Sequence, residues 1–251
     1  MKRTWLCFLL FSGLVLIPVT AYVQESLVKD TAVFDKAFIP ALFLTGQAKV
    51  EQSQMAMKFV KEGWADYKKK YYEAQPKDAR WKQDMEKVEG YIMAAATLVA
   101  GGKDLSKAHE ELEGVRGLLM EARKRNRIEY FPDLLTEFHR YMEEIFDAAA
   151  KKKPETLSDN DMGTFKKILP TAIASWEAVK TAKFEARVFG FDPEKVQKLK
   201  QLHKAEEDAL WALQEAVKTG DKAEIIQHAT SLKGKFVPVY LLFGDFERLK
   251  K

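Results

Sequence analysis

Residues 196–217 read VQKLKQLHKAEEDALWALQEAV, and apolar side chains recur in this stretch every three or four positions. This spacing predicts a helix with one apolar face, formed by Leu199, Leu202, Leu210, Leu213 and Val217. Glu206 falls in the middle of that face, and His203 lies one turn earlier at its edge. Burying a bare carboxylate is costly. We therefore expect Glu206 to be paired, protonated or bound to a metal.

Helical spacing continues along most of the chain. Apolar residues recur with the same period over residues 34–71, 81–99, 105–122, 132–145, 165–179 and 225–243. Pro132 and Asp192-Pro193 are helix-start signals, whereas Gly101-Gly102 and Gly220 are helix-end signals. Strand-type alternation is not convincing in any stretch. The sequence therefore predicts an all-α protein, an antiparallel helical bundle, in which residues 34–71 form one long or broken helix.

The chain divides at a segment without periodicity, residues 151–163, which contains proline, serine, aspartate and asparagine. We interpret it as a linker between a first helical bundle, residues 22–150, and a second, residues 164–251. The two parts share weak similarities: Phe38-Ile39-Pro40 resembles Ile168-Leu169-Pro170, and Gly101-Gly102 before His109 resembles Gly220 before His228. Two tandem bundles that arose by duplication are one reading, and a single bundle is the other.

The N-terminus has the pattern of an export signal. Met1-Lys2-Arg3 precedes an apolar run, and Val19 and Ala21 fit a signal-peptidase site. We expect residues 1–21 to be a cleaved signal peptide and the protein to be periplasmic or secreted; an uncleaved anchor is the alternative. The single cysteine, Cys7, leaves with this segment, and no later stretch is apolar enough to cross a membrane.

Charge and motifs exclude several classes of function. Cleavage removes Lys2 and Arg3, so the formal charge of +4 falls by two. Basic clusters at residues 68–70, 123–127 and 151–153 lie near the ends of predicted helices, where they complement the helix dipole. We expect no nucleic-acid binding. The chain also lacks the common hydrolase, zinc-protease, phosphate-loop and dinucleotide motifs, so we expect no enzymatic activity.

His203 and Glu206 form the best candidate metal site. Residues three apart on a helix lie on the same face, and helical-bundle metal sites use such pairs. The alternatives are an ion pair between Glu206 and a lysine of the preceding helix, Lys180 or Lys183, or a Glu206 that faces the surface. A second candidate cluster comprises His109, His139 and Met142, because imidazole and thioether are ligands of copper and haem iron.

Ordinary structural roles explain Met142, and also a third group of candidate residues, equally well. Met142 belongs to an apolar stripe, so a role in the core explains it as well. Arg116, Arg123 and Arg127 lie near one flank of a predicted helix and could gather an anionic ligand. Salt bridges to the abundant glutamates explain these arginines equally well.

The last two predicted helices resemble those of the periplasmic cytochrome b/cytochrome c-prime group of four-helix bundles. The resemblance rests on Ala212-Leu213, Ala216, Gly220, Glu224, Leu232-Lys233 and Tyr240. It implies a four-helix fold, haem and electron transfer. The chain departs from the group in lacking a Cys-x-x-Cys-His attachment motif. Tyr240 stands about where the b-type family places a histidine ligand, and tyrosine can ligate haem iron.

Taken together, these patterns predict an exported, non-enzymatic helical-bundle protein that binds a transition metal or haem between its helices. The alternative is a metal-free periplasmic scaffold or interaction module with a protein partner.

Overall fold

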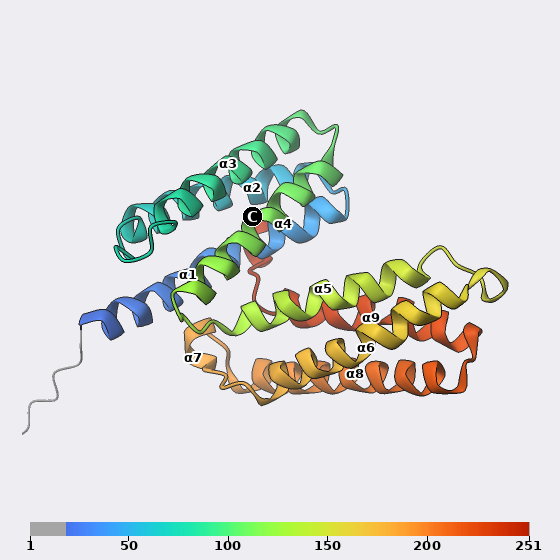
Figure 1. Ribbon diagram of the computed structural model, residues 1–251. Helices are drawn as coiled ribbons and strands as arrows, with labels where there is room; N and C mark the ends of the chain where they lie inside the picture. The colour runs from blue at the N-terminus through green and yellow to red at the C-terminus, as the bar shows by residue number, and fades with distance from the viewer. Residues whose placement is uncertain (1–18, 251) are drawn as a thin grey trace, which may run out of the picture.

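The computed structural model describes residues 19–250, and within them it is all-α. Figure 1 shows two groups of long helices lying one above the other. The helices are α1 (Val19–Gly46), α2 (Val50–Tyr71), α3 (Trp81–Gly101), α4 (Leu105–Arg125), α5 (Phe131–Ala149), α6 (Asp159–Thr181), α7 (Ala186–Phe189), α8 (Pro193–Thr219) and α9 (Lys222–Leu241), with short 3-10 turns η1 (Pro154–Thr156) and η2 (Glu247–Lys250). The predicted fold class is confirmed.

The first bundle consists of α1, α2, α3 and α4. Each packs against two of the others, α1 and α3 both lying against α2 and α4. The long helix predicted over residues 34–71 is broken, because Ala48 adopts a positive φ of 54° and the chain reverses between α1 and α2. Gly46, the last residue of α1, directly precedes this reversal, and the break agrees with the broken form of the predicted helix.

The second bundle consists of α5, α6, α8 and α9, with α5 and α8 both lying against α6 and α9. This arrangement differs from the predicted division, which put α5 in the first bundle and a linker at residues 151–163. The segment between α5 and α6 instead joins two neighbours within one bundle. Ser158 caps α6 through a reciprocal pair with Asp161, so this helix begins earlier than residue 164.

The two bundles repeat the same helix order. Helices α3 and α8 both end in left-handed glycines, Gly102 (φ 64°) and Gly220 (φ 76°). When these caps are aligned, buried positions coincide: Trp81 with Leu199, Val88 with Glu206, Ile92 with Leu210, Ala95 with Leu213 and Val99 with Val217. In this alignment α1 corresponds to α5, and the duplication expected from the sequence stays a prediction. Pro40 in α1 and Pro170 in α6 therefore occupy different places.

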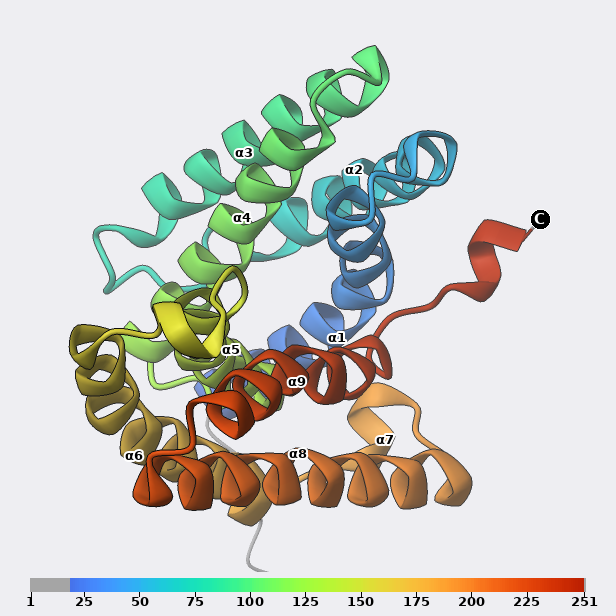
Figure 2. The same ribbon diagram turned by 90° about the vertical axis from the view of Figure 1, so that its right-hand side faces the viewer.

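Helix α1 joins the bundles, because it also contacts α7 and α9. The chain after α9 crosses back to the first bundle (Figure 2), where Asp245 N donates to Lys36 O at 2.9 Å and Phe246 packs on Phe43. The predicted signal peptide lies outside the described residues except for residues 19–21, with which α1 begins. Among residues 19–250, no helix combines the length and hydropathy that crossing a membrane requires.

Candidate functional site

Glu206 is fully buried, with no exposed side-chain surface, as its place in the apolar stripe predicted. Within the described residues, neither of its carboxylate oxygens has a hydrogen-bond partner. Burial raises the pKa of Glu206 to about 9, because the charged form loses its hydration. The side chain is therefore protonated at neutral pH.

The ion pair expected for Glu206 does not form. Lys180 contacts Glu177 and Glu207 instead, and Lys183 contacts Glu185. The reason is geometric: Glu207, one position further along α8, is half-buried at the edge of the helix, where a lysine reaches it without leaving water.

His203 lies one turn before Glu206 on α8, and its ring packs among aromatic side chains. Its ring stacks on Phe131 with 6.2 Å between centroids and meets Trp176 edge-on at 5.4 Å. Its Nε2 atom is buried without a partner, and burial lowers the pKa of His203 to about 4. Within the described residues, no group of three or more histidine, cysteine or acidic side chains is arranged to hold a metal. The pair is a neutral polar patch inside the second bundle.

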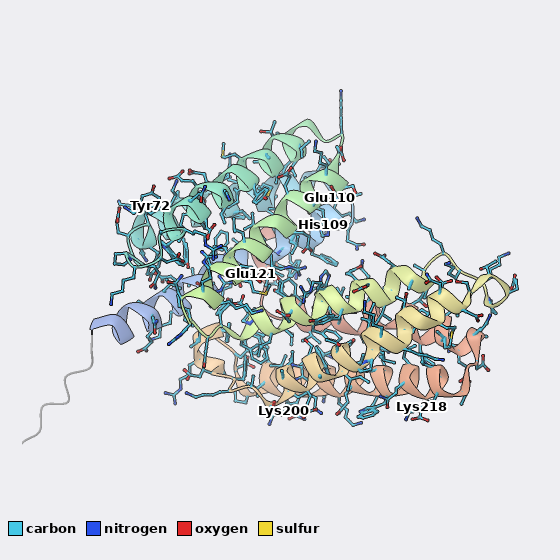
Figure 3. All side chains as sticks on the ribbon, viewed as in Figure 1. Tyr72, His109, Glu110, Glu121, Lys200 and Lys218 are labelled. Atoms are coloured by element: carbon cyan, nitrogen blue, oxygen red, sulfur yellow. The ribbon has the colours of Figure 1, made fainter. Side chains whose placement is uncertain are left out.

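Outside that core, a second group of polar and ionisable side chains lines a cavity between the two bundles. A half-open cavity of about 310 Å³ is bounded by α1, α4, α5 and α9. Its apolar wall consists of Leu42, Phe43, Phe236, Val237 and Leu241, and its polar wall includes His109, Glu113, Arg116, His139, Glu143 and Lys233. His109 is labelled on α4 in Figure 3, on the side of the first bundle that faces the second.

Arg116 lies at the centre of the polar wall and is only 8% exposed. Its Nη2 atom donates to Nδ1 of His139 at 2.8 Å and to Glu113 Oε2. Its guanidinium also lies over the Tyr240 ring, 5.3 Å from the centroid, an arrangement that favours the cation. Arg116 thus connects α4 of the first bundle with α5 and α9 of the second.

The network continues from His139 to Lys233. Because arginine can only donate, Nδ1 of His139 is the acceptor and Nε2 carries the proton, which faces Glu143 Oε1 at 3.2 Å. Burial and Arg116 lower the pKa of His139, which favours the neutral ring that the hydrogen bond from Arg116 requires. Lys233 also reaches Glu143 Oε1, at 2.9 Å. Although burial opposes it, these two hydrogen bonds lower the pKa of Glu143 to about 2.

His109 has the opposite tautomer. Its Nδ1 lies 2.9 Å from Leu42 O, and because a carbonyl oxygen only accepts, Nδ1 carries the proton. Nε2 then faces Glu113 Oε1 at 3.6 Å, and the side chain is 34% exposed. Gly46 makes room for this ring, since a Cβ atom there would lie 3.1 Å from its Nδ1 and Cε1 atoms.

A smaller polar pocket adjoins this wall. It has a volume of about 10 Å³ and is lined partly by Asp35, Arg123, Tyr130 and Asp133, enough space for about one water molecule. Arg123 donates to both oxygens of Asp133, at 2.8 and 2.5 Å, and Tyr130 donates to Asp35 at 2.6 Å. The predicted group of three arginines is therefore divided, since Arg123 is held by Asp133 and Arg127 is exposed.

The second predicted cluster is only partly assembled. His109 and His139 line the same cavity, whereas Met142 is fully buried in the core and is absent from that lining. Glu113 and Glu143 were not predicted as site residues. A signal for them exists, because both histidines are followed four positions later by glutamate, and i,i+4 residues share a helix face.

Comparison of the chain with protein-family models, with curated proteins and with solved structures found no match in any of the three.

Proposed function

We propose that this protein binds a small organic molecule in the cavity between its two bundles and releases it unchanged. The observation that carries the proposal is the pairing of an apolar wall with a wall of oriented, hydrogen-bonded charges. The cavity volume of about 310 Å³ lies at the lower end of the range for small-molecule sites. Export to the periplasm and the absence of catalysis, both expected from the sequence, are part of this proposal.

The polar wall supports binding because its side chains are already held in place. Arg116 and His139 fix one another across the bundle interface, and Glu143 holds Lys233. A ligand that meets such preorganised groups loses less free energy to ordering them.

A transition metal is the second candidate, favoured by the two His–Glu pairs in the same cavity. It ranks lower because, within residues 19–250, no three histidine, cysteine or acidic side chains are grouped so that they could hold a metal ion. Haem fits the residues less well. Tyr240, the position suggested by the cytochrome resemblance, is 8% exposed. Burial raises its pKa, which opposes ligation by a tyrosinate, whereas the neighbouring Arg116 acts in the opposite direction.

An interaction module stays the alternative proposal. Its support is weak, because the exposed large apolar side chains in residues 24–250 are spread over four helices: Val33 on α1, Met55 on α2, Tyr91 and Met93 on α3, and Trp211 on α8. They do not indicate one docking face.

Isothermal titration calorimetry with three probes of the same apolar body tests the proposal: 2-phenylethylamine, 2-phenylethanol and phenylacetate. At least one should bind with one-to-one stoichiometry. Val237→Phe should fill the cavity and abolish this binding, whereas Val33→Phe, at a side chain that is 57% exposed, should leave it intact. Absence of binding by all three probes at millimolar concentration, or unchanged binding by Val237→Phe, would refute the function.

A further inference from the structure

The donors and acceptors of the cavity are not balanced evenly along its wall. At one end, Nε2 of His109 and Oε1 of Glu113 face one another at 3.6 Å. His109 is protonated on Nδ1, where it donates to Leu42 O, so in the neutral ring Nε2 is an acceptor. When the ring is neutral, Nε2 and Oε1 are two acceptors 3.6 Å apart, and one cationic group placed beside them can donate to both.

Both acceptors are fixed by their neighbours. Glu113 presents Oε1 to the cavity because its other oxygen accepts from Arg116. His109 is held by Leu42 on one side and packs closely on Gly46. Their spacing of four residues on α4 keeps the two groups on the same helix face.

The end of α1 adds a third source of negative potential. Helix α1 ends at Gly46, which lines the cavity together with Gln47 and Ala48. The carbonyl end of a helix carries a partial negative charge and attracts cations. The last turn of α1 contains no basic residue, unlike the last turns of α2 and α4. The potential at this helix end is therefore not offset by the helix's own side chains.

The two cations that line the cavity do not cancel the negative potential at this end, because each is already paired with a glutamate. Arg116 is paired with Glu113, and Lys233 is paired with Glu143. A carboxylate ligand would have to displace one of these glutamates and would also meet the C-terminal end of α1. An ammonium group meets acceptors that already face the cavity.

From these observations we infer that the ligand is a primary amine with an apolar body, whose ammonium group donates to His109 Nε2 and Glu113 Oε1. The apolar body lies against Phe43, Phe236 and Val237, which also line the cavity. This inference rests on the proposed function and specifies its ligand class.

The three probes separate charge from shape, because they share one ring and differ in the polar group. In buffer with EDTA at pH 7.5, 2-phenylethylamine should bind about 10- to 100-fold more tightly than 2-phenylethanol. This ratio of affinities corresponds to the free energy of one or two charged hydrogen bonds. Phenylacetate should bind most weakly. Glu113→Gln should reduce the preference for the amine over the alcohol to about threefold or less, and Glu110→Gln, at an exposed neighbour on the same helix, should retain it.

The possible outcomes distinguish the inferred ligand class, a primary amine, from the proposed function, small-molecule binding in the cavity. If the alcohol or phenylacetate binds as tightly as the amine, the ligand class is wrong and the binding function survives. The same holds if folded Glu113→Gln, checked by circular dichroism, keeps the full amine preference. Binding of ZnCl₂ in EDTA-free buffer that His109→Leu abolishes, without any amine binding, would overturn the inference in favour of a metal.

Discussion

His139 accepts a hydrogen bond from Arg116, with 2.8 Å between Nδ1 and Nη2. The two residues belong to different bundles, since Arg116 lies on α4 and His139 on α5. Arg116 also contacts Glu113 and Tyr240. A single buried guanidinium therefore closes one side of the cavity and ties the two halves of the molecule together.

Replacement of Arg116 tests this tie. Arg116→Met should lower the free energy of unfolding by about 3 kcal/mol, because loss of one partner leaves the others buried without compensation. Urea denaturation monitored by circular dichroism measures the effect. Arg140→Met is the control, because the Arg140 side chain is 67% exposed, and its loss should cost less than about 1 kcal/mol. Equal losses in the two variants would contradict the bridging role.

Replacement of Glu206 by an apolar residue should make the folded protein more stable. Val88 occupies the matching position in the first bundle, so valine suits this environment. Glu206→Val should raise the free energy of unfolding by about 1–3 kcal/mol, because it removes a buried carboxyl without partners. Glu207→Val, which breaks the contact with Lys180, should give no gain. Destabilisation by Glu206→Val would show that the carboxyl has a partner.

The raised pKa of Glu206 predicts a pH dependence with a definite sign. Between pH 4.5 and about 9, the folded chain keeps a proton on Glu206 that the unfolded chain has lost. Stability from this group is therefore complete below pH 4.5 and falls as pH rises, by at most about 1.4 kcal/mol per pH unit. The lowered pKa of His203 acts in the opposite direction, but only between about pH 4 and 6.5.

The comparison is therefore best made between pH 7 and pH 8.5, where His203 is neutral in both states. Over this range the wild-type protein should lose about 2 kcal/mol more stability than Glu206→Gln. Urea unfolding at both pH values provides the measurement. Parallel pH profiles for the two proteins would mean that Glu206 is already ionised or hydrated.

Two glycines make a matched test of how His109 is positioned. A Cβ atom at Gly46 would meet the His109 ring at 3.1 Å, whereas one at Gly117 meets nothing within 4 Å. Gly117→Ala should stabilise the protein by up to about 1 kcal/mol through helix propensity. Gly46→Ala should give no such gain and should weaken 2-phenylethylamine binding. Thermal unfolding and calorimetry measure these effects, and a Gly46→Ala protein that binds the amine normally would contradict the predicted contact.

Periodicity of about 3.6 residues was enough to predict most of the long helices and the burial of Glu206, but it did not predict residues 22–33 of α1 or the short helix α7. It could not indicate which helices pack together, because α5 has the same kind of apolar stripe whichever bundle it joins. The prediction for residues 34–71 left a long and a broken helix open, and the structure shows the break at Ala48, just after Gly46.

The candidate site also depends on which helices pack together, which the sequence pattern did not indicate. His109 and His139 were proposed as one cluster, and the structure brings both to one cavity. Their glutamate partners and the role of Arg116 depend on contacts between helices that are distant in sequence. The spacing of Met142 matched that of a ligand, but it lies on the core side of α5.

The most direct test of the account is nitrogen-15 NMR of the four histidine rings during titration with 2-phenylethylamine. We predict that Nδ1 of His109 and Nε2 of His139 carry the protons in the free protein. Added amine should shift the Nε2 resonance of His109 and leave those of His203 and His228 unchanged. A response confined to His203, or no response from any ring at saturating amine, would contradict a binding site between the bundles.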